Sequence, residues 1–343
     1  MTVHLVYPHR NITSAPNVIG YKLKIELQKH FNVVTHNWDS IKTIRPNDGD
    51  MLIGHPHPIG FTIFRNSVKI PGWSRKIIMQ PYNSDYSQVG YIDDVIDECD
   101  LFLAITGDYW FDNIKNSSTS RWLPKMKHLN LAVDRLQFPK IKKSFNPPGE
   151  RRFLYIGNDH PGKNLSYLGS IATRLCGYEF AWAGKGAAHS GLKKLGYIDF
   201  ASSTGRQVVK NYDFMITAGK ADANPTTILE ALSWGLIPIC TETSGYYREF
   251  GIVNISNDDV DSACSVISEL QFMESDDLSR LATAGDALLT QKYNWQSFFS
   301  VVLESLFSDA SPSISPKSVS SQSRLNGITF KGLAKLVINN LKK

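Results

Sequence analysis

The 343-residue chain is 42% hydrophobic and 20% charged, which is typical of a globular protein, and its length favours about two domains. Its net charge of +5 is too small for a dedicated nucleic-acid binder but fits a protein that handles anions. Four cysteines, at 99, 176, 240 and 264, lack the spacing of a zinc or redox site. The start "MTVHLVYPHR" has no long apolar segment, and no apolar run approaches about 18 residues. We therefore expect a cytoplasmic protein that is neither exported nor membrane-spanning.

Short apolar runs alternate with amphipathic stretches along the chain. This alternation predicts the α/β class, with parallel sheets, right-handed crossovers and ligands beyond the carboxyl ends of the strands. The strands expected in the first half are 3–8, 31–36, 50–55, 76–81 and 101–106, with a helix over about 17–30. Those expected in the second half are 152–157, 180–184, 213–217, 237–240 and 251–255, with a helix near 163–175.

The stretch "FPKIKKSFNPPGERR" is basic, rich in proline and without apolar periodicity, and it indicates a linker. We expect a first domain over 1–140, the linker over 141–151 and a second domain over 152–307. Residues 308–343 begin as a Ser/Pro-rich tether and end in "LNGITFKGLAKLVINNLKK", in which Leu333, Leu336, Val337 and Leu341 share one helical face. This basic amphipathic tail either lies on an anionic membrane surface or docks on the protein itself or on a partner.

The stretch "DANPTTILEALSWGLIPI" predicts a helix followed by a strand. Asn224 is a good N-cap, Pro225 a good first helical residue, and Gly235 a good end. Thr226 and Thr227 then lie on the first turn, where free N–H groups and the helix dipole attract anions. Phosphate is the anion that this arrangement favours.

Glu230 lies one turn beyond Thr226 on the same helical face, about 5 Å along the axis. This is roughly the distance from a phosphate to a ribose, so phosphate at the helix start and ribose hydroxyls at Glu230 would together hold a nucleotide diphosphate. The alternative is that the Asn-Pro-Thr-Thr sequence only caps a helix and that Glu230 is a solvated carboxylate.

A second constellation occurs in "FLYIGNDHPGKNLSYLGSIATRL", which predicts a strand, a glycine-containing loop and a helix. The loop carries Lys163, which is well placed to neutralise a diphosphate, although a single lysine there is usually only a surface charge. Neither a P-loop nor a dinucleotide-binding glycine motif is present. Kinase, ATPase and dehydrogenase functions are therefore disfavoured.

Taken in order, "FLYIGNDHPGKN", "FAWAGKG", "GYIDF", "YDFMITAGKADANPTTILEALSWGLIPIC" and "TSGY" resemble the donor domain of retaining GT-B glycosyltransferases, particularly glycosyltransferase family 4. The resemblance implies a GT-B fold, in which two Rossmann-like parallel-sheet domains face each other across a cleft. It also implies a nucleotide-diphosphate sugar as donor.

The resemblance assigns donor-binding roles. Lys163 and the first turn of the helix would bind the diphosphate, Glu230 the ribose, and Tyr197 with Ile198 would lie near the base. The implied donor-binding residues are Asn158, Lys163, Tyr197, Ile198, Asn224, Thr226, Thr227 and Glu230.

Two positions depart from the family pattern. Asp222, which would sit near the donor sugar as a catalytic residue, replaces the usual glutamate and is one methylene shorter. Asn158 replaces the usual arginine, so one positive charge is missing from the expected diphosphate site. His160 or Lys220 would be the nearest substitutes.

The first half resembles the family less specifically. "MLIGHPHPI" matches the strand end that carries a histidine at the acceptor cleft, and His55 and His57, as catalytic candidates on an extended segment, should point to opposite sides. The alternative is a structural loop histidine. Gly20 falls in the expected glycine-containing first loop, and Tyr82 and Asn83 are further acceptor-cleft candidates.

The retaining mechanism implied by the resemblance needs no protein general base, because the donor phosphate accepts the proton. The protein then mainly positions both substrates and stabilises charge on the diphosphate. No metal or other cofactor is expected. "NDGD" at 47–50 indicates a turn and "NDDVD" at 257–261 a helix start, so neither is interpreted as a metal site.

We therefore predict a metal-independent retaining glycosyltransferase that moves a sugar to a saccharide or glycolipid acceptor in surface polysaccharide or glycolipid synthesis. It would be cytoplasmic, with possible peripheral contact at the inner face of the membrane through the tail, and would not bind nucleic acid. A related epimerase or hydrolase is disfavoured because the first half lacks a convincing carboxylate pair. The main alternative is a non-catalytic sugar-nucleotide-binding or scaffold protein.

Overall fold

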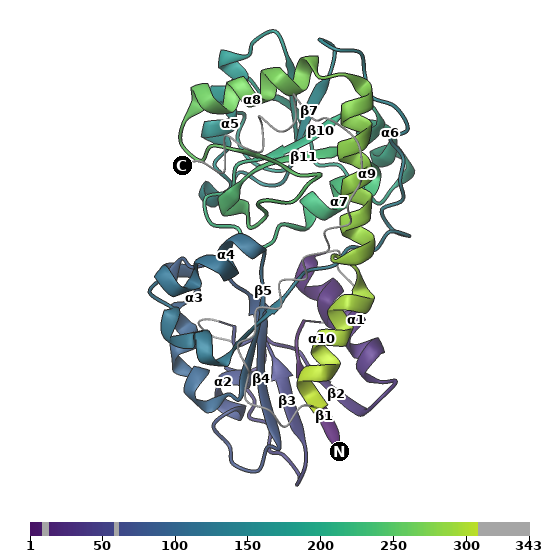
Figure 1. Cartoon of the computed structure of the whole chain (residues 1–343). Coiled ribbons are helices and arrows are strands. Elements are labelled where there is room, and N and C mark those ends of the chain that lie inside the picture. Colours follow the sequence, from purple (N-terminus) through teal and green to yellow (C-terminus); the bar gives the residue numbers. More distant parts are fainter. Residues whose placement is uncertain (9–13, 58–61, 308–343) are drawn as a thin grey trace, which may run out of the picture. The chain divides into compact units, whose positions relative to one another are not determined.

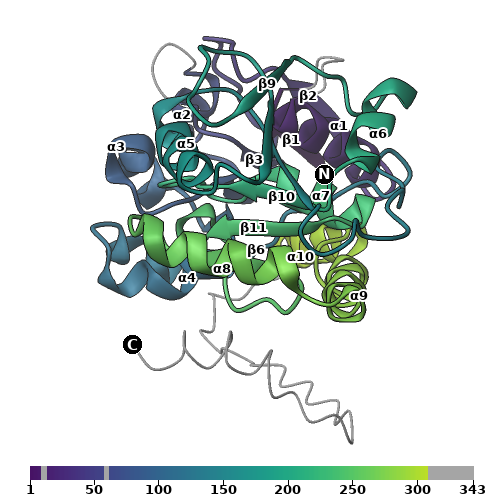
Figure 2. The ribbon, with the colours of Figure 1, turned by 90° about the horizontal axis from the view of Figure 1, so that it is seen from above.

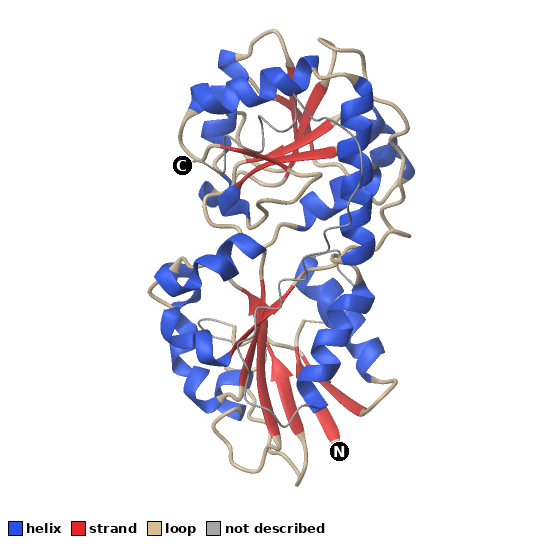
Figure 3. Ribbon diagram, viewed as in Figure 1, coloured by secondary structure: helices blue, strands red, loops and turns tan. Residues whose placement is uncertain are grey.

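The computed structural model describes residues 1–8, 14–57 and 62–307. Within these residues the chain forms two six-stranded sheets (Figure 1), and all strand pairs in both sheets are parallel. Helices lie on both sides of each sheet (Figure 3). The predicted α/β class with two parallel sheets is confirmed. The basic tail predicted over 308–343 lies outside the described residues.

The first sheet has the strand order β2-β1-β3-β4-β5-β6. Its direction of winding reverses between β1 and β3, and ligands of doubly wound sheets bind beyond the carboxyl ends at such a point. The strands and helices of this half are β1 Thr2–Val6, α1 Ala15–Leu27, β2 Asn32–His36, β3 Met51–Gly54, α2 Ile63–Ser67, β4 Arg75–Pro81, α3 Tyr86–Val89, β5 Leu101–Ile105, α4 Asp108–Asn113 and β6 Met126–Leu129.

The second sheet has the order β12-β11-β10-β7-β8-β9, with the reversal between β7 and β10. Its elements are β7 Arg152–Ile156, α5 Leu165–Arg174, β8 Glu179–Ala183, β9 Lys193–Gly196, α6 Ser203–Lys210, β10 Phe214–Thr217, α7 Thr226–Trp234, β11 Ile237–Thr241, β12 Val253–Ile255, α8 Val260–Phe272, α9 Ser275–Gln291 and α10 Trp295–Phe307. Helices α9 and α10 follow one another in Figure 1, and in Figure 2, where α9 is seen nearly end-on, α10 lies next to it.

Every expected strand is present, but two strands were missed. β6 has the sequence MKHL and β9 has KKLG, and each lies at an edge of its sheet. Edge strands are solvated along one side and tolerate charged residues. The two segments therefore lack the continuous apolar run that revealed the central strands.

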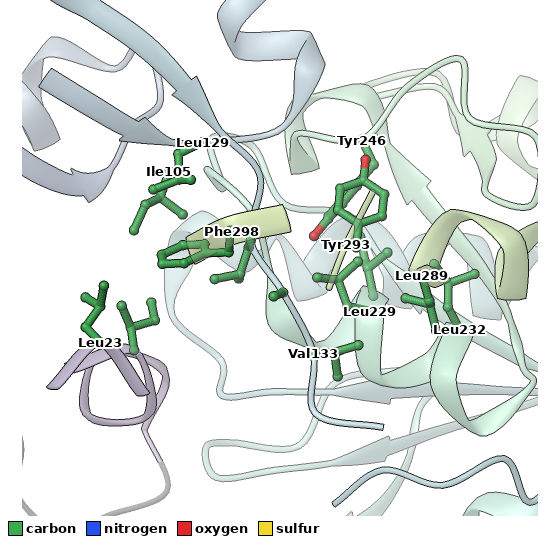
Figure 4. Packing of buried hydrophobic residues seen from close by; sticks show 14 of the residues in the cluster. Leu23, Ile105, Leu129, Val133, Leu229, Leu232, Tyr246, Leu289, Tyr293 and Phe298 are labelled. Carbon is green, nitrogen blue, oxygen red and sulfur yellow. The ribbon is translucent and has the colours of Figure 1, made fainter. Parts of the chain in front are cut away.

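Helix α7 shows how the second half builds its core. Its inner face buries Ile228, Leu229 and Leu232, and Leu232 and Leu289 of α9 lie side by side in Figure 4. Burying each such side chain stabilises the fold by about 1.5–3 kcal/mol. The helix ends at Gly235, whose φ of +87° is the left-handed conformation that glycine adopts without strain.

Helix α10, at the end of the described chain, packs against elements near its beginning. It contacts α1 of the first half, the rings of Phe31 and Phe307 stack with centroids 5.1 Å apart, and Phe298 and Leu23 belong to one buried cluster. Figure 4 shows Phe298 among the first-half residues Ile105 and Leu129. The domain limits expected from the sequence stay a prediction, but α10 packs on the first half.

Candidate functional site

A cavity of about 320 Å³ lies at the carboxyl ends of strands from both sheets. The first half contributes residues that follow or end β1, β4, β5 and β6, and the second half contributes the ends of β7 and β10 and the start of α7. This is the edge at which parallel sheets place their ligands. The lining residues are Tyr7, Ala15, Pro16, Ile19, Pro81, Ile105, Leu131, Tyr155, Ile156, Gly157, Asn158, Lys163, Thr217, Asp222, Ala223, Asn224, Pro225, Thr226 and Thr227.

The first turn of α7 forms one wall of this cavity. Pro225 is the N-cap residue, with an extended φ of −62° and ψ of 125°, so the predicted N-cap at Asn224 is wrong by one residue. The Asn224 carboxamide oxygen accepts a hydrogen bond from the buried Tyr246 hydroxyl instead. Among the described residues no side chain caps this helix, so its N-terminal N–H groups are open to an anion beside Thr226 and Thr227.

Lys163 and Asp222 meet at the same cavity. Lys163 ends a short 3-10 turn, Pro161–Lys163, and its ammonium group forms an ion pair with the Asp222 carboxylate. Both side chains are partly exposed. The sequence placed the lysine at a diphosphate and the aspartate at a sugar, and the structure pairs them directly. An anion that enters the cavity therefore competes with Asp222 for the lysine.

Asn158 lines the cavity but adds no charge. Its backbone oxygen accepts a hydrogen bond from the Tyr155 hydroxyl at 2.9 Å, and its side-chain oxygen accepts one from the His160 N–H at 3.3 Å. His160 Nδ1 accepts from the Gly162 N–H at 3.2 Å, so this imidazole supports the loop. Burial raises the pKa of the Tyr155 phenol, and the negative charge of the nearby Asp222 raises it further.

A second cavity, of about 180 Å³, adjoins the first, and Thr226 lines both. Its wall includes Glu230, Tyr197 and Ile198, three residues that the sequence assigned to ribose and base binding. Tyr197 is 67% exposed, and the Lys185 ammonium lies 5.2 Å from its ring centre. The structure thus brings the predicted phosphate and ribose groups of α7 to two adjoining cavities.

The pKa of the Glu230 carboxyl is raised above its ordinary value. Burial raises the pKa of its carboxyl to about 7, and a hydrogen bond from the Thr226 hydroxyl opposes this effect. Glu230 is only partly exposed at the wall of the smaller cavity, which disfavours the alternative of a fully solvated carboxylate. Hydroxyl donors from a bound ligand would favour the ionised form.

His55 and His57 do not point to opposite sides. Their ring centroids lie 4.9 Å and 4.5 Å from that of Trp38, and 5.8 Å from each other. The reason is that β3 ends at Gly54 and the His57 N–H donates to the His55 carbonyl, so the segment turns instead of continuing extended. His55 also packs against Tyr7, a residue of the larger cavity, at 5.9 Å between ring centroids.

His55 is buried, with 8% of its surface exposed. Burial lowers the pKa of its imidazole to about 3, and the nearby His57 contributes. Within the described residues its Nδ1 atom has no hydrogen-bond partner. His55 is therefore neutral at physiological pH and belongs to an aromatic cluster, as in the structural alternative.

The three residues predicted to line the acceptor cleft make contacts that support the fold. Gly20 lies inside α1 and not in a loop, and a Cβ at this position would come within 2.1 Å of the Pro8 oxygen. Tyr82 is fully buried, and its hydroxyl lies 2.6 Å from that of Thr119. Asn83 is 6% exposed and donates to the Ala221 oxygen at 2.8 Å. None of these three assignments to the cleft is supported by the described contacts.

The two acidic stretches behave as the sequence indicated. The Asp50 carboxylate accepts the backbone N–H groups of Thr2 and Asn47, which closes the turn at 47–50. Asp259 caps α8 by accepting from the Ser262 N–H at 3.0 Å. In the part of the chain that the structure describes, no three His, Cys, Asp or Glu side chains gather closely enough to hold a metal ion.

Sequence reasoning missed the contribution of the first half to both cavities. Tyr7 directly follows β1 and Leu131 lies two residues beyond β6, and the rule that ligands gather at carboxyl ends could have found them. Asp134, paired with Lys22 at 2.6 Å, and Trp295 line the smaller cavity. No local motif marks these residues, because they come together only through the fold.

No helix within 1–8, 14–57 and 62–307 is long and apolar enough to cross a membrane.

Neither a family model nor a curated protein sequence matches the chain. Among solved structures, the sucrose-phosphate synthase of Thermosynechococcus elongatus matches with a TM-score of 0.64 and 11% identity, over 90% of this chain and 99% of that one. An α-glucosyltransferase in complex with UDP and DNA matches with a TM-score of 0.60 and 11% identity, over 90% and 100%.

S. aureus TarM, crystallised with UDP, matches with a TM-score of 0.57 and 12% identity, over 76% of this chain and 55% of its own. The chain thus spans about half the length of TarM. At such low identities these likenesses establish architecture alone. Together with the two parallel sheets, they show that this chain has the GT-B fold.

Proposed function

We propose that this protein is a glycosyltransferase that moves a sugar from a nucleotide-diphosphate sugar to a saccharide or lipid-linked acceptor. The observation that carries the proposal is the arrangement of α7, whose open first turn lines one cavity and whose Glu230 lines the next. Lys163 lies at the first of these cavities. A diphosphate and a ribose need these groups in this order.

In the proposed complex the diphosphate lies at the α7 N-terminus and draws Lys163 away from Asp222. The helix dipole and the ammonium group then stabilise the negative charge that develops as the bond from the sugar to the diphosphate breaks. Glu230 accepts hydrogen bonds from the ribose hydroxyls, and Tyr197 and Ile198 lie beside the base. Asp222, once released by Lys163, is available to the hydroxyls of the sugar.

We propose that transfer retains the anomeric configuration, as the resemblance to glycosyltransferase family 4 implies. The acceptor hydroxyl oxygen bonds to the anomeric carbon on the face that the diphosphate leaves, and its proton passes to a diphosphate oxygen. No protein base is needed, which agrees with the buried, neutral state of His55. A hexose donor, metal independence, an acceptor other than nucleic acid, and a role in surface polysaccharide or glycolipid synthesis complete the proposal.

A second candidate is a non-catalytic sugar-nucleotide-binding or scaffold protein. Two observations favour it: Asp222 is occupied by Lys163, and Asn158 supplies no charge to the cavity. Such a protein would bind the nucleotide sugar without releasing the sugar.

Isothermal titration of UDP-, GDP- and ADP-sugars into the wild type and Glu230→Ala tests the proposal. We expect micromolar binding of one donor and about tenfold weaker binding by the variant, because a ribose hydrogen bond to a charged acceptor is lost. Glu269→Ala, which removes an exposed glutamate of α8, is the matched control.

A donor-hydrolysis assay on any donor that binds separates the two candidates. Slow release of sugar supports the transferase, whereas binding without turnover, even with candidate acceptors, supports the non-catalytic protein. Binding of none of the three donors by the wild type would refute both.

A further inference from the structure

Three consecutive carbonyl groups of the second half accept hydrogen bonds from the first half. We call residues 219–225, which lead from β10 to α7, the Asp222 loop. The Ala221 oxygen accepts from the Asn83 side chain at 2.8 Å, the Asp222 oxygen from the Trp110 indole at 2.8 Å, and the Ala223 oxygen from the Gly107 N–H at 2.9 Å.

The three donors lie at the carboxyl-terminal end of the first sheet. Asn83 follows β4, and Gly107 and Trp110 follow β5, so all lie beyond carboxyl ends of neighbouring strands. Asn83 and Trp110 are buried, with 6% and 7% of their surfaces exposed. Buried hydrogen bonds of this length are costly to lose, because the orphaned carbonyl is shielded from water.

The approach at Gly107 is too close for a side chain. A Cβ at Gly107 would come within 2.0 Å of the Gly245 oxygen, and one at Gly245 would come within 2.4 Å of the Ala223 oxygen. Gly245 also has a φ of +93°, which disfavours other residues. Two glycines thus let the backbone of the first half reach the Asp222 loop.

The other side of the loop faces the cavity. The Asp222 N–H donates to the Thr243 oxygen at 3.0 Å, and the Lys220 N–H donates to the Gly162 oxygen at 2.9 Å, next to Lys163. Because each peptide is planar and trans, carbonyls that point to the first half turn the N–H groups of Ala223 and Asn224 away from it. Both residues line the larger cavity.

We propose that Asn83, Gly107 and Trp110 are positioning residues, which hold the Asp222 loop in the shape that the nucleotide diphosphate requires; the proposal rests on the proposed function. They act through the backbone of residues 221–223 and need not touch the ligand. The first half therefore contributes to nucleotide affinity from the side opposite the cavity.

Two variants remove single donors. Trp110→Phe keeps an aromatic ring and removes the indole N–H. Asn83→Asp keeps the oxygen that accepts from the Asp85 N–H at 3.0 Å and replaces the amide that faces Ala221. Trp122→Phe is the matched control, because Trp122 is 1% exposed and its indole donates to Asp93 Oδ1 at 2.7 Å, away from the loop.

Hydrogen–deuterium exchange of the ligand-free protein tests the loop itself. We expect the amides of residues 220–227 to exchange about tenfold faster in Trp110→Phe and Asn83→Asp, the effect of one lost buried hydrogen bond. We expect Trp122→Phe to exchange like the wild type in this segment. Unchanged exchange in both loop variants would overturn the proposal.

Titration with UDP, GDP and ADP then tests the effect on the site. We expect about tenfold weaker binding of the preferred nucleotide by both loop variants, and in donor hydrolysis a raised KM with kcat changed less than twofold. Faster exchange with unchanged affinity would overturn the positioning role. If the wild type binds none of the nucleotides, the proposed function fails, and exchange alone decides whether these residues hold the loop.

Discussion

The start of α7 and the segment at residues 55–57 occupy comparable places, since each follows the carboxyl end of a parallel strand, and each was predicted to contribute to the site. The first turn of α7 opens onto a cavity. The two histidines instead pack against Trp38. A position beyond a strand end is therefore not sufficient to make a residue part of a site. Burying the free backbone N–H groups of a helix start without a partner is costly, whereas a neutral imidazole can pack among aromatic rings, and burial lowers the pKa of His55.

Among the variants that test the α7 side of the site, Lys163→Met should weaken ligand binding most. Lys163 is the only basic residue among the described residues that line the larger cavity. The variant therefore removes the one positively charged side chain that these described residues place beside the α7 N-terminus. We expect nucleotide-diphosphate binding to weaken by roughly 10- to 100-fold, the range for hydrogen bonds to charged groups. Isothermal titration measures it.

Lys193→Met is the control, because Lys193 is a surface residue 3.7 Å from Glu179. Equal affinity of Lys163→Met and the wild type would show that α7 alone holds the anion.

Glu230→Gln should change how stability depends on pH. Between pH 4.5 and about 7 the folded wild type holds a proton that the unfolded chain releases, because burial raises the carboxyl pKa. Its free energy of unfolding therefore falls as pH rises through this window. Glutamine stays neutral, so we expect the variant to gain about 2–3 kcal/mol relative to the wild type at pH 8, compared with pH 4.5.

Urea unfolding at the two pH values measures this gain, with Glu269→Gln as the exposed control. An identical difference at both pH values would show that Glu230 ionises normally.

His55→Phe tests the segment at residues 55–57. Burial lowers the pKa of His55 to about 3, so below pH 6.5 the unfolded chain takes up a proton that the folded chain excludes. The corresponding stability is present above pH 6.5 and is lost as pH falls. We expect the wild type to lose about 2 kcal/mol more than the variant between pH 7 and pH 5.

His30→Phe, at an exposed position after α1, controls for the added ring. Nucleotide binding should stay within about twofold of the wild type, because His55 packs against Tyr7 and is not among the described residues that line the larger cavity. Loss of turnover with unchanged binding and stability would instead return His55 to the acceptor site.

Tyr82→Phe should change the protein least. It removes the hydroxyl that lies 2.6 Å from Thr119 in the core of the first half. We expect a loss of about 1 kcal/mol in the free energy of unfolding and no change in nucleotide affinity. Tyr21→Phe, at a tyrosine that is 54% exposed, is the control. A change in affinity without a loss of stability would support the original assignment of Tyr82 to the acceptor cleft.

Much of the fold was predictable because the central strands are continuous apolar runs, such as LFLAI of β5, all of which are buried. The α7 side of the site was predictable for a similar reason. Its phosphate and ribose groups are close in sequence, so helical geometry alone relates Thr226 to Glu230. The N-cap was misassigned because Asn224 is used by Tyr246, a residue that no local pattern connects to it.

The first-half side was not predictable by the same means. Whether His55 is open or buried depends on Trp38 and Tyr7, which lie in other segments. Asn83 was predicted to meet an acceptor, yet its amide meets a backbone carbonyl of the second half. Such pairings depend on the three-dimensional fold, because residues more than a hundred positions apart supply donor and acceptor.

Helix α10 has a consequence for how the chain forms during synthesis. The buried cluster that contains Leu23 of α1 also contains Phe298, Val302 and Leu306. A ribosome completes the first sheet long before it makes α10, so α1 can pack on β1 and β2 early, whereas the part of its surface that meets α10 stays uncovered until nearly the whole described chain has been made. The half that is made first is thus the half that finishes last, and until then its exposed face is a target for chaperones.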